Sequence, residues 1–379
     1  MKTDFIILFL DLKQPCRLLP KLQGTSGKTD KEINMKLGIT GLPQTGKKTL
    51  FTLLTGSAPA PDKQKTVTGM AEIKDSRFDK LAAMFMPKKE VRARLDLNLL
   101  PEFGGANLEG IADVDALCHV VRAFEDSAVY HVSGSVNPAR DIQTVESELI
   151  LHDLLFIEKR GERIAKERRA KDEKRLQEEE GLLGRFKAHL ESDAPLRTAG
   201  EITDDEAKII ASYPFLTRKP MLVVLNTSEA APVPEDVSDL CKKFSADILT
   251  VPVKLESEIA ELETEEERRE FMADAGIKES ALVQLSALAM KSLGLLSFFT
   301  VGKDEVRQWL VRAGSSAPVA AGAVHTDIQR GFIRAEVIKY DDLISLGSEE
   351  EVKKAGKLYV MGKDYVIEDG DIVNFRFNV

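Results

Sequence analysis

A glycine-rich segment beginning at residue 41 has the spacing of a phosphate-binding loop. Gly41 and Gly46 are followed at once by Lys47, which matches the pattern GxxxxGK. In such a loop the backbone N–H groups and the positive end of the next helix attract phosphate, and the lysine reaches the β- and γ-phosphates. The predicted phosphate-binding residues are Gly41, Leu42, Pro43, Gln44, Thr45, Gly46, Lys47, Lys48 and Thr49. This segment therefore predicts a nucleotide site.

The position after Lys47 departs from the usual pattern. Most such loops have Ser or Thr there, and its hydroxyl group binds Mg²⁺, whereas this chain has Lys48. A charged ammonium group has no lone pair to offer a metal ion, and Thr49 lies one step too far round the expected helix. Either Mg²⁺ is held indirectly or Lys48 supplies positive charge in its place. No metal ligand is assigned, and a role for Mg²⁺ is doubtful.

The segments around this loop predict the elements that hold it. Residues 35–40 are an apolar run and residues 48–55 have helical spacing, so the loop joins a strand to a helix. Further apolar runs at 116–121 and 221–225 are typical of buried parallel strands, and 249–253 is a weaker third. Strands that alternate with helices predict an α/β fold with a mostly parallel, doubly wound sheet, as in P-loop G-domains.

Two other loops of a GTPase-like domain are altered. The strand expected at 94–100 is not followed by DxxG; Asp96 lies within the strand, and Glu102 is a weak substitute. After the run 221–225, the residues Asn226-Thr227-Ser228-Glu229 stand where GTPases have the guanine-reading NKxD. The predicted base-binding residues are Asn226, Thr227 and Glu229. Because Glu replaces the usual Asp, we expect weaker selection of guanine, with adenine as an alternative.

The rest of the chain divides into two segments that differ in charge density and in apolar pattern. Residues 158–180 are dense in both charge signs, which is typical of a solvated helical hairpin or coiled coil; nucleic-acid binding is the less favoured alternative. Gly181 and Gly184 are expected to break the helix, and a returning helix to end near Leu190. From about residue 300, short strand-like runs predict a compact β-rich module, and they include 365–367 before a turn at 369–371.

Composition limits the classes of protein. The chain has 379 residues and a net charge of -9, which argues against a general nucleic-acid coat protein. Its three cysteines are far apart and its five histidines show no paired spacing, so neither a disulfide framework nor a metal site is predicted. No apolar run approaches the roughly 20 residues needed to span a bilayer. We expect a cytoplasmic protein without a membrane partner.

These motifs resemble those of the Obg-like ATPase family, also called YchF. The segment GLPQTGKKTLF at 41–51 looks like that family's GLPNVGKSTLF, and the loop at 226–229 matches its NxxE base loop. Other stretches look like the approach to its coiled coil or like its C-terminal TGS module. The stretches that look like the approach to the coiled coil are 114–126, 131–132, 137–142 and 148–151. The stretches that look like the TGS module are 298–302, 317–327, 331–337 and 370–379. The resemblance covers about residues 35–379.

The resemblance implies a G-domain interrupted by a coiled coil and followed by a β-grasp TGS domain. The expected domains are an N-terminal extension of unknown role (1–34), the first part of the G-domain (35–145), the helical insertion (146–206), the second part of the G-domain (207–299) and the TGS domain (300–379). It also implies binding of ATP, often alongside GTP, slow hydrolysis, and association with the ribosome or ribosomal RNA.

Three hypotheses about function follow. The first is a cytoplasmic, translation-associated regulator that binds a purine nucleotide, with ATP favoured over GTP and with weak or absent hydrolysis. The second is a competent slow ATPase or GTPase switch, and the third is an interaction scaffold with a vestigial P-loop. Lys48 and the missing DxxG favour the first and third hypotheses. The intact Gly41, Gly46 and Lys47 favour the first over the third. Whether the chain is an enzyme stays open, and no catalytic residue is assigned.

Overall fold

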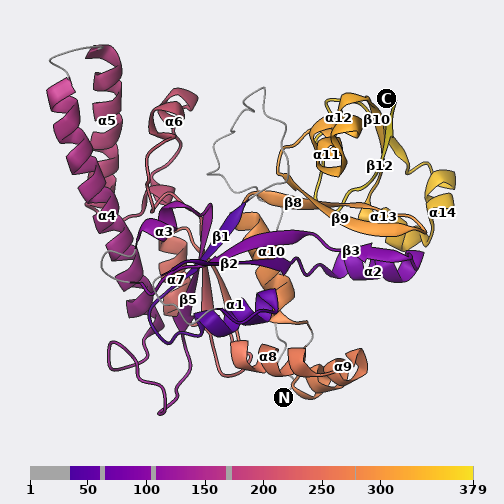
Figure 1. Ribbon diagram of the computed structural model, residues 1–379, viewed down its shortest axis with the longest axis horizontal. Helices are drawn as coiled ribbons and strands as arrows, with labels where there is room; N and C mark the ends of the chain where they lie inside the picture. The colour runs from indigo at the N-terminus through magenta and orange to yellow at the C-terminus, as the bar shows by residue number, and fades with distance from the viewer. Residues whose placement is uncertain (1–34, 60–64, 104–107, 168–172, 278, 379) are drawn as a thin grey trace.

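The computed structural model describes residues 35–59, 65–103, 108–167, 173–277 and 279–378, and the expected N-terminal extension lies outside these ranges (Figure 1). The described residues form two six-stranded sheets. The first has the order β2-β4-β1-β5-β6-β7, and the second has the order β11-β10-β12-β8-β9-β3.

The first sheet carries the glycine-rich loop. Its strands are β1 (Lys36–Thr40), β2 (Val67–Glu72), β4 (Arg94–Leu99), β5 (Ala116–Arg122), β6 (Met221–Asn226) and β7 (Asp247–Val251). Only the edge strand β2 runs antiparallel to its neighbour, and the other strands are parallel. Parallel strands joined by crossover helices place their carboxyl ends, and the loops that follow them, along one edge of the sheet.

Helices cover both faces of this sheet. One face packs against α1 (Lys47–Thr55), α8 (Val253–Glu261) and α10 (Ala281–Ser292), and the other against α3 (Glu109–Ala112), α4 (Pro138–Glu167) and α7 (Glu235–Lys243). In β5, Cys118 and Val120 face the first group of helices, whereas Leu117 and Val121 face the second. This alternation explains why the buried strands are apolar throughout. The predicted α/β, doubly wound fold class is confirmed.

Two long helices form a hairpin that projects from the body of the molecule (Figure 1). They are α4 and α5 (Glu173–Leu190), and they are followed by the short helices η1 (Leu196–Thr198) and α6 (Asp204–Ile210). Ile150, Ile157 and Ile164 recur at a heptad interval and form the hairpin core with residues of α5. The expected break at Gly181 and Gly184 is wrong, since both lie inside α5, where the packed neighbours Leu182, Leu183 and Phe186 offset the low helix propensity of glycine.

The second sheet belongs to the C-terminal part of the chain. Its strands are β3 (Lys89–Val91), β8 (Leu295–Thr300), β9 (Glu305–Arg312), β10 (Phe332–Ile338), β11 (Tyr359–Met361) and β12 (Ile372–Phe377). Its helices are α11 (Ala317–Val324), α12 (Thr326–Arg330), α13 (Tyr340–Leu346) and α14 (Glu349–Lys354). The strand expected at 365–367 is reduced to an isolated bridge between Val366 and Ser316. The predicted domain boundary at residue 300 stays a prediction, and β8, which precedes it, lies in this sheet.

One segment connects the two sheets. After β2 the chain forms α2 (Ser76–Phe85) and β3, both of which pack on the C-terminal module before β4 returns to the first sheet (Figure 1). Strand β3 pairs in parallel with β9. Phe78 and Leu81 of α2 are buried in one cluster with Phe299 and Val306. The remaining helix, α9 (Glu265–Asp274), follows α8.

Candidate nucleotide-binding site

The two motif glycines have conformations and surroundings that a larger residue would not fit. Gly41 has φ 140° and Gly46 has φ 94°, both in the region that favours glycine. A Cβ atom at Gly41 would lie 2.3 Å from the carbonyl oxygen of Val120, and one at Gly46 would lie 2.2 Å from Nδ2 of Asn226. The loop therefore follows the sheet edge closely and directs the chain into the first turn of α1.

Lys47 lies inside this loop. Its side chain is buried, and Nζ donates hydrogen bonds to the carbonyl oxygens of Gly41, at 2.7 Å, and Leu42. Burial lowers the pKa of Lys47 to about 8; the carboxylate of Glu102 opposes this shift, and the positive charge of Lys48 adds to it. Lys47 is therefore mainly charged at neutral pH, and it lies at the N-terminus of α1, where the helix dipole and the ammonium group would both attract a phosphate group.

The other predicted phosphate-binding residues differ in exposure. Leu42 and Thr45 are buried, Pro43 is half-buried, and Gln44, Lys48 and Thr49 are exposed. The hydroxyl group of Thr45 donates to the carbonyl oxygen of Leu42 at 3.1 Å, which stabilises the turn. The ammonium group of Lys48 has no hydrogen bond or ion pair with any described residue, so it is free to approach a bound anion.

Asn226 links the base loop to the phosphate loop. Its Nδ2 donates to the carbonyl oxygen of Thr45 at 3.0 Å, and its Oδ1 accepts from the backbone N–H of Val253 at 3.3 Å. Thr227 is half-buried, and its buried hydroxyl has no hydrogen-bond partner among the described residues. Glu229 is exposed. The structure thus gives Asn226 a contact that sequence reasoning missed, and base binding by these three residues stays a prediction.

A buried histidine, His119, lies beneath the loop, and the spacing of the histidines gave no signal for it. His119 of β5 is adjacent to Thr40 in the sheet, and its Cδ2 lies 3.3 Å from where a Cβ atom of Gly41 would stand. Burial lowers its pKa to about 3, with further contributions from the charges of Lys47 and Arg197. Neither ring nitrogen has a hydrogen-bond partner in the part of the chain that the structure describes. His119 is therefore neutral and adds no positive charge beneath Lys47.

The loop after β5 is also fixed by internal contacts. Arg122 is buried and donates to the carbonyl oxygens of Phe124, Asp126 and Val129. His131 accepts from the backbone N–H of Ser133 through Nδ1, so its Nε2 carries the proton that faces Asp141 Oδ2 at 2.9 Å. Within the described ranges, no group of three or more His, Cys, Asp or Glu side chains could hold a metal ion.

The parallel sheet, the glycine loop between β1 and α1, and Asn226 at the end of β6 define a P-loop nucleotide-binding protein of the GTPase-like class. The family model YchF-GTPase_C, described as "Protein of unknown function (DUF933)", matches residues 295–378. The chain is 39% identical to "Ribosome-binding ATPase YchF" of Bacillus subtilis (strain 168), over 90% of this chain and 99% of that protein. The chain belongs to the YchF family of Obg-like ATPases.

Other relatives agree with this membership. "Obg-like ATPase 1" of Oryza sativa subsp. japonica is 36% identical, over 91% of this chain and 93% of that protein. Among solved structures, "Structure of the Schizosaccharomyces pombe YchF GTPase" superposes with a TM-score of 0.77 and 31% identity, over 91% of this chain and 98% of that chain. The two chains therefore share their fold over nearly their whole lengths. None of the described helices is both long and apolar enough to cross a membrane.

Proposed function

We propose that this chain is a cytoplasmic regulator of translation that binds a purine nucleotide and associates with the ribosome. The observation that carries the proposal is the buried Lys47 within an intact glycine loop at the N-terminus of α1. Backbone N–H groups, a helix dipole and a buried ammonium group together favour a di- or triphosphate. The names of the bacterial relatives support the ribosome as partner, since those proteins are called ribosome-binding ATPases.

ATP is the favoured nucleotide in this proposal. Guanine offers donors at N1 and N2, which the Asp of NKxD accepts, whereas this chain has the longer Glu229 on an exposed turn. Asn226 has both an amide donor and a carbonyl acceptor and so can serve either base. A site that lacks a well-placed carboxylate loses its preference for guanine, because specificity is a difference between two affinities. We expect ATP to bind at least as well as GTP.

Weak or absent hydrolysis is the second part of the proposal. In P-loop proteins the metal ion bridges the β- and γ-phosphates and is held by a hydroxyl group of the loop. Here Lys48 takes that position, and its positive charge lowers the pKa of Lys47, which means that the two ammonium groups repel each other. A polyphosphate would relieve this repulsion. Lys48 therefore takes over part of the charge neutralisation that Mg²⁺ supplies elsewhere.

Calorimetric titration of the full chain with ATP and GTP, with and without Mg²⁺, tests the site. Lys47→Ala removes a charge-assisted contact and should weaken binding by about 1.5–3 kcal/mol. Lys80→Ala is the matched control, because Lys80 is an exposed lysine of α2. Equal affinity of wild type and Lys47→Ala would exclude the loop as the site. A tenfold preference for GTP, about 1.4 kcal/mol, would contradict the expected base selection.

A further inference from the structure

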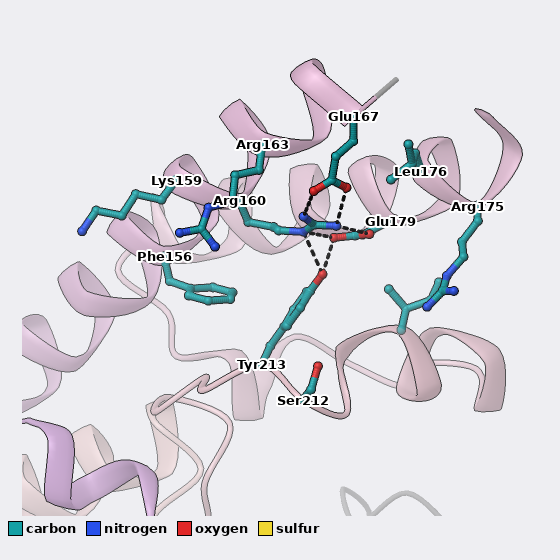
Figure 2. A pocket seen from close by; sticks show the side chains of 11 residues that line it. Phe156, Lys159, Arg160, Arg163, Glu167, Arg175, Leu176, Glu179, Ser212 and Tyr213 are labelled. Atoms are coloured by element: carbon teal, nitrogen blue, oxygen red, sulfur yellow. Dashed lines mark hydrogen bonds and ion pairs between the residues drawn. The ribbon is translucent and has the colours of Figure 1, made fainter. Parts of the chain in front are cut away.

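A large cavity lies in the outer half of the helical hairpin, far along the chain from the glycine loop. It measures about 820 Å³ and is lined by α4, by α5 and by the segment that leaves α6 (Figure 2). Phe156 of α4 and Tyr213, just after α6, form part of its wall, with ring centroids 5.1 Å apart. Ligand pockets of roughly 300–1,000 Å³ hold drug-sized molecules. This cavity can therefore accept a ligand of the size of one or two nucleotides.

A partly buried network of hydrogen bonds and ion pairs keeps the wall of the cavity in place. Arg160 donates from Nε to Glu179 Oε1 at 2.6 Å and from Nη2 to Glu179 Oε2 at 3.0 Å, and from Nη1 to Glu167 at 2.9 Å. Its Nε also lies 3.0 Å from the hydroxyl group of Tyr213, which in turn donates to Glu179 (Figure 2). Glu179 is buried. Its pair with Arg160 joins α5 to α4, and its hydrogen bond with Tyr213 fixes that residue against both helices. The charge of Arg160 is balanced within the wall.

Three other cations line the cavity without a hydrogen-bonded acidic partner among the described residues, although the charge of Arg175 contributes to the lowered pKa of Glu179. Lys159 and Arg163 come from α4 and Arg175 comes from α5, and all three side chains are exposed. None forms a hydrogen bond or ion pair with a described residue. Both carboxylates of the lining, Glu167 and Glu179, are already paired with Arg160. The lining thus has four cationic and two acidic side chains, in a chain whose net charge is -9.

We propose that this cavity binds single-stranded RNA, with phosphates on Lys159, Arg163 and Arg175 and a base against Phe156 and Tyr213. The proposal rests on the association with the ribosome proposed above and names the surface that would contact RNA. Cations next to aromatic rings are the typical combination for single-stranded nucleic acid, because phosphates bind the cations and any base can stack on a ring. A concave pocket of this size accepts an unstacked nucleotide, whereas the stacked bases of a duplex cannot enter it.

Fluorescence anisotropy with a labelled oligoribonucleotide containing only uridine tests this site in the full chain. The pocket variant is Arg163→Gln/Arg175→Gln. The matched control is Lys166→Gln/Lys174→Gln, which removes the same charge from exposed positions of the same two helices outside the cavity. We expect at least a tenfold loss of affinity in the pocket variant and less than a twofold change in the control. The magnitude of the slope of log K against log salt should fall by about 1.4 in the pocket variant, because each of the two lost phosphate contacts on a single strand contributes about 0.7.

The outcomes separate this inference from the proposed function. Equal losses in both variants, an unchanged salt slope, or the absence of RNA binding by wild type would overturn the inference. Tighter binding of a polyglutamate peptide than of the oligonucleotide would also overturn it, because it would assign the cavity to an acidic protein partner. ATP titration and cosedimentation with purified ribosomes are measured on the same wild-type protein. If wild type binds ATP and sediments with ribosomes while the RNA assay fails, only the inference falls. Circular dichroism of both variants checks that the hairpin is intact.

Discussion

Lys47 carries a positive charge at neutral pH although its burial disfavours the charged form. Its pKa is lowered to about 8, mainly by burial, from an ordinary value of 10.5. Because the folded-state pKa lies below the unfolded value, the folded chain binds fewer protons than the unfolded chain between these two values, and stability rises with pH across that window. Below about pH 8 the penalty for burying the ammonium group is fully present. A bound polyphosphate would offset that penalty.

This leads to a prediction about pH. Nucleotide affinity should be nearly constant between about pH 7 and pH 7.5 and should fall above about pH 8, because Lys47 loses the proton that makes it attractive to phosphate. Phosphate should raise the pKa of Lys47, so protons should be taken up on binding near pH 8. Calorimetry in two buffers of different ionisation enthalpy measures this uptake. In Lys47→Met the uptake should vanish. An affinity that stays constant to about pH 9.5 would disprove the assignment.

Lys48→Ser is the second prediction at this scale. The substitution restores the hydroxyl group that usually binds Mg²⁺ and removes a cation beside Lys47. We expect lower affinity for ATP without metal and a greater gain on adding Mg²⁺ than in wild type, both measured by titration. The alternative is a loop that binds no nucleotide in either form. Rapid Mg²⁺-dependent turnover by the wild-type protein would contradict both possibilities.

At the scale of the elements, a buried ion pair connects the base of the hairpin to the first sheet's helical layer. Glu146 of α4 and Arg197 of η1 are paired and almost completely buried. Arg197 also donates to the carbonyl oxygen of Phe244, at the end of α7, at 2.6 Å. Oε1 of Glu146 has no partner among the described residues. The orientation of α4 on the body therefore depends on Arg197.

We predict that Arg197→Met destabilises the protein by about 3–5 kcal/mol, because Glu146 would remain buried without a counter-charge. Glu146→Leu/Arg197→Met should recover much of this loss, since the double variant leaves no unpaired charge. Urea unfolding measures both. Arg185→Met is the control, because its pair with Glu206 is partly exposed and should contribute about 0–1 kcal/mol. A loss in Arg197→Met no greater than in the control would refute the argument.

The sequence predicted elements better than contacts. Apolar runs located β1, β5 and β6 because buried parallel strands are apolar on both faces. The helix break at Gly181 and Gly184 was wrong because packing of the hairpin overrides glycine's weak propensity. The contacts of Asn226 with Thr45, and the place of His119 beneath the loop, join residues that are distant in the chain. Motif spacing describes the chain locally and carries no information about such pairs.

At the scale of the molecule, the arm formed by α2 and β3 makes the C-terminal module depend on a segment that lies between two strands of the first sheet, β2 and β4. Phe78 is fully buried in a cluster that joins Leu81 of α2 to Phe299 and Ile338 of the C-terminal module. Arg77, beside it, pairs with Asp369 at 2.7 Å and with Asp75 at 2.8 Å. The module's core is incomplete without this arm. The two sheets should therefore not unfold independently.

Phe78→Ala tests this dependence. The substitution leaves a cavity in the shared cluster and should cost about 3–5 kcal/mol. We expect hydrogen–deuterium exchange to rise most in β8, β9 and β12, although the mutated residue lies more than 200 positions earlier in the chain. Leu50→Ala, in the core of the first sheet, is the comparison and should act mainly on β1 and its neighbours. Exchange that rises only within residues 65–103 would show that the two parts are uncoupled.

The same arm has a consequence for biosynthesis. Helix α2 leaves the ribosome early, but most of the residues that cover its apolar face, from Phe299 onward, are translated near the end of the chain. At about 5–20 residues per second, the nascent chain spends on the order of ten seconds or longer with the apolar side chains of Phe78 and Leu81 uncovered. Such a chain offers an apolar helix to chaperones for most of its synthesis. Its final shape is fixed only when the last module has emerged from the exit tunnel.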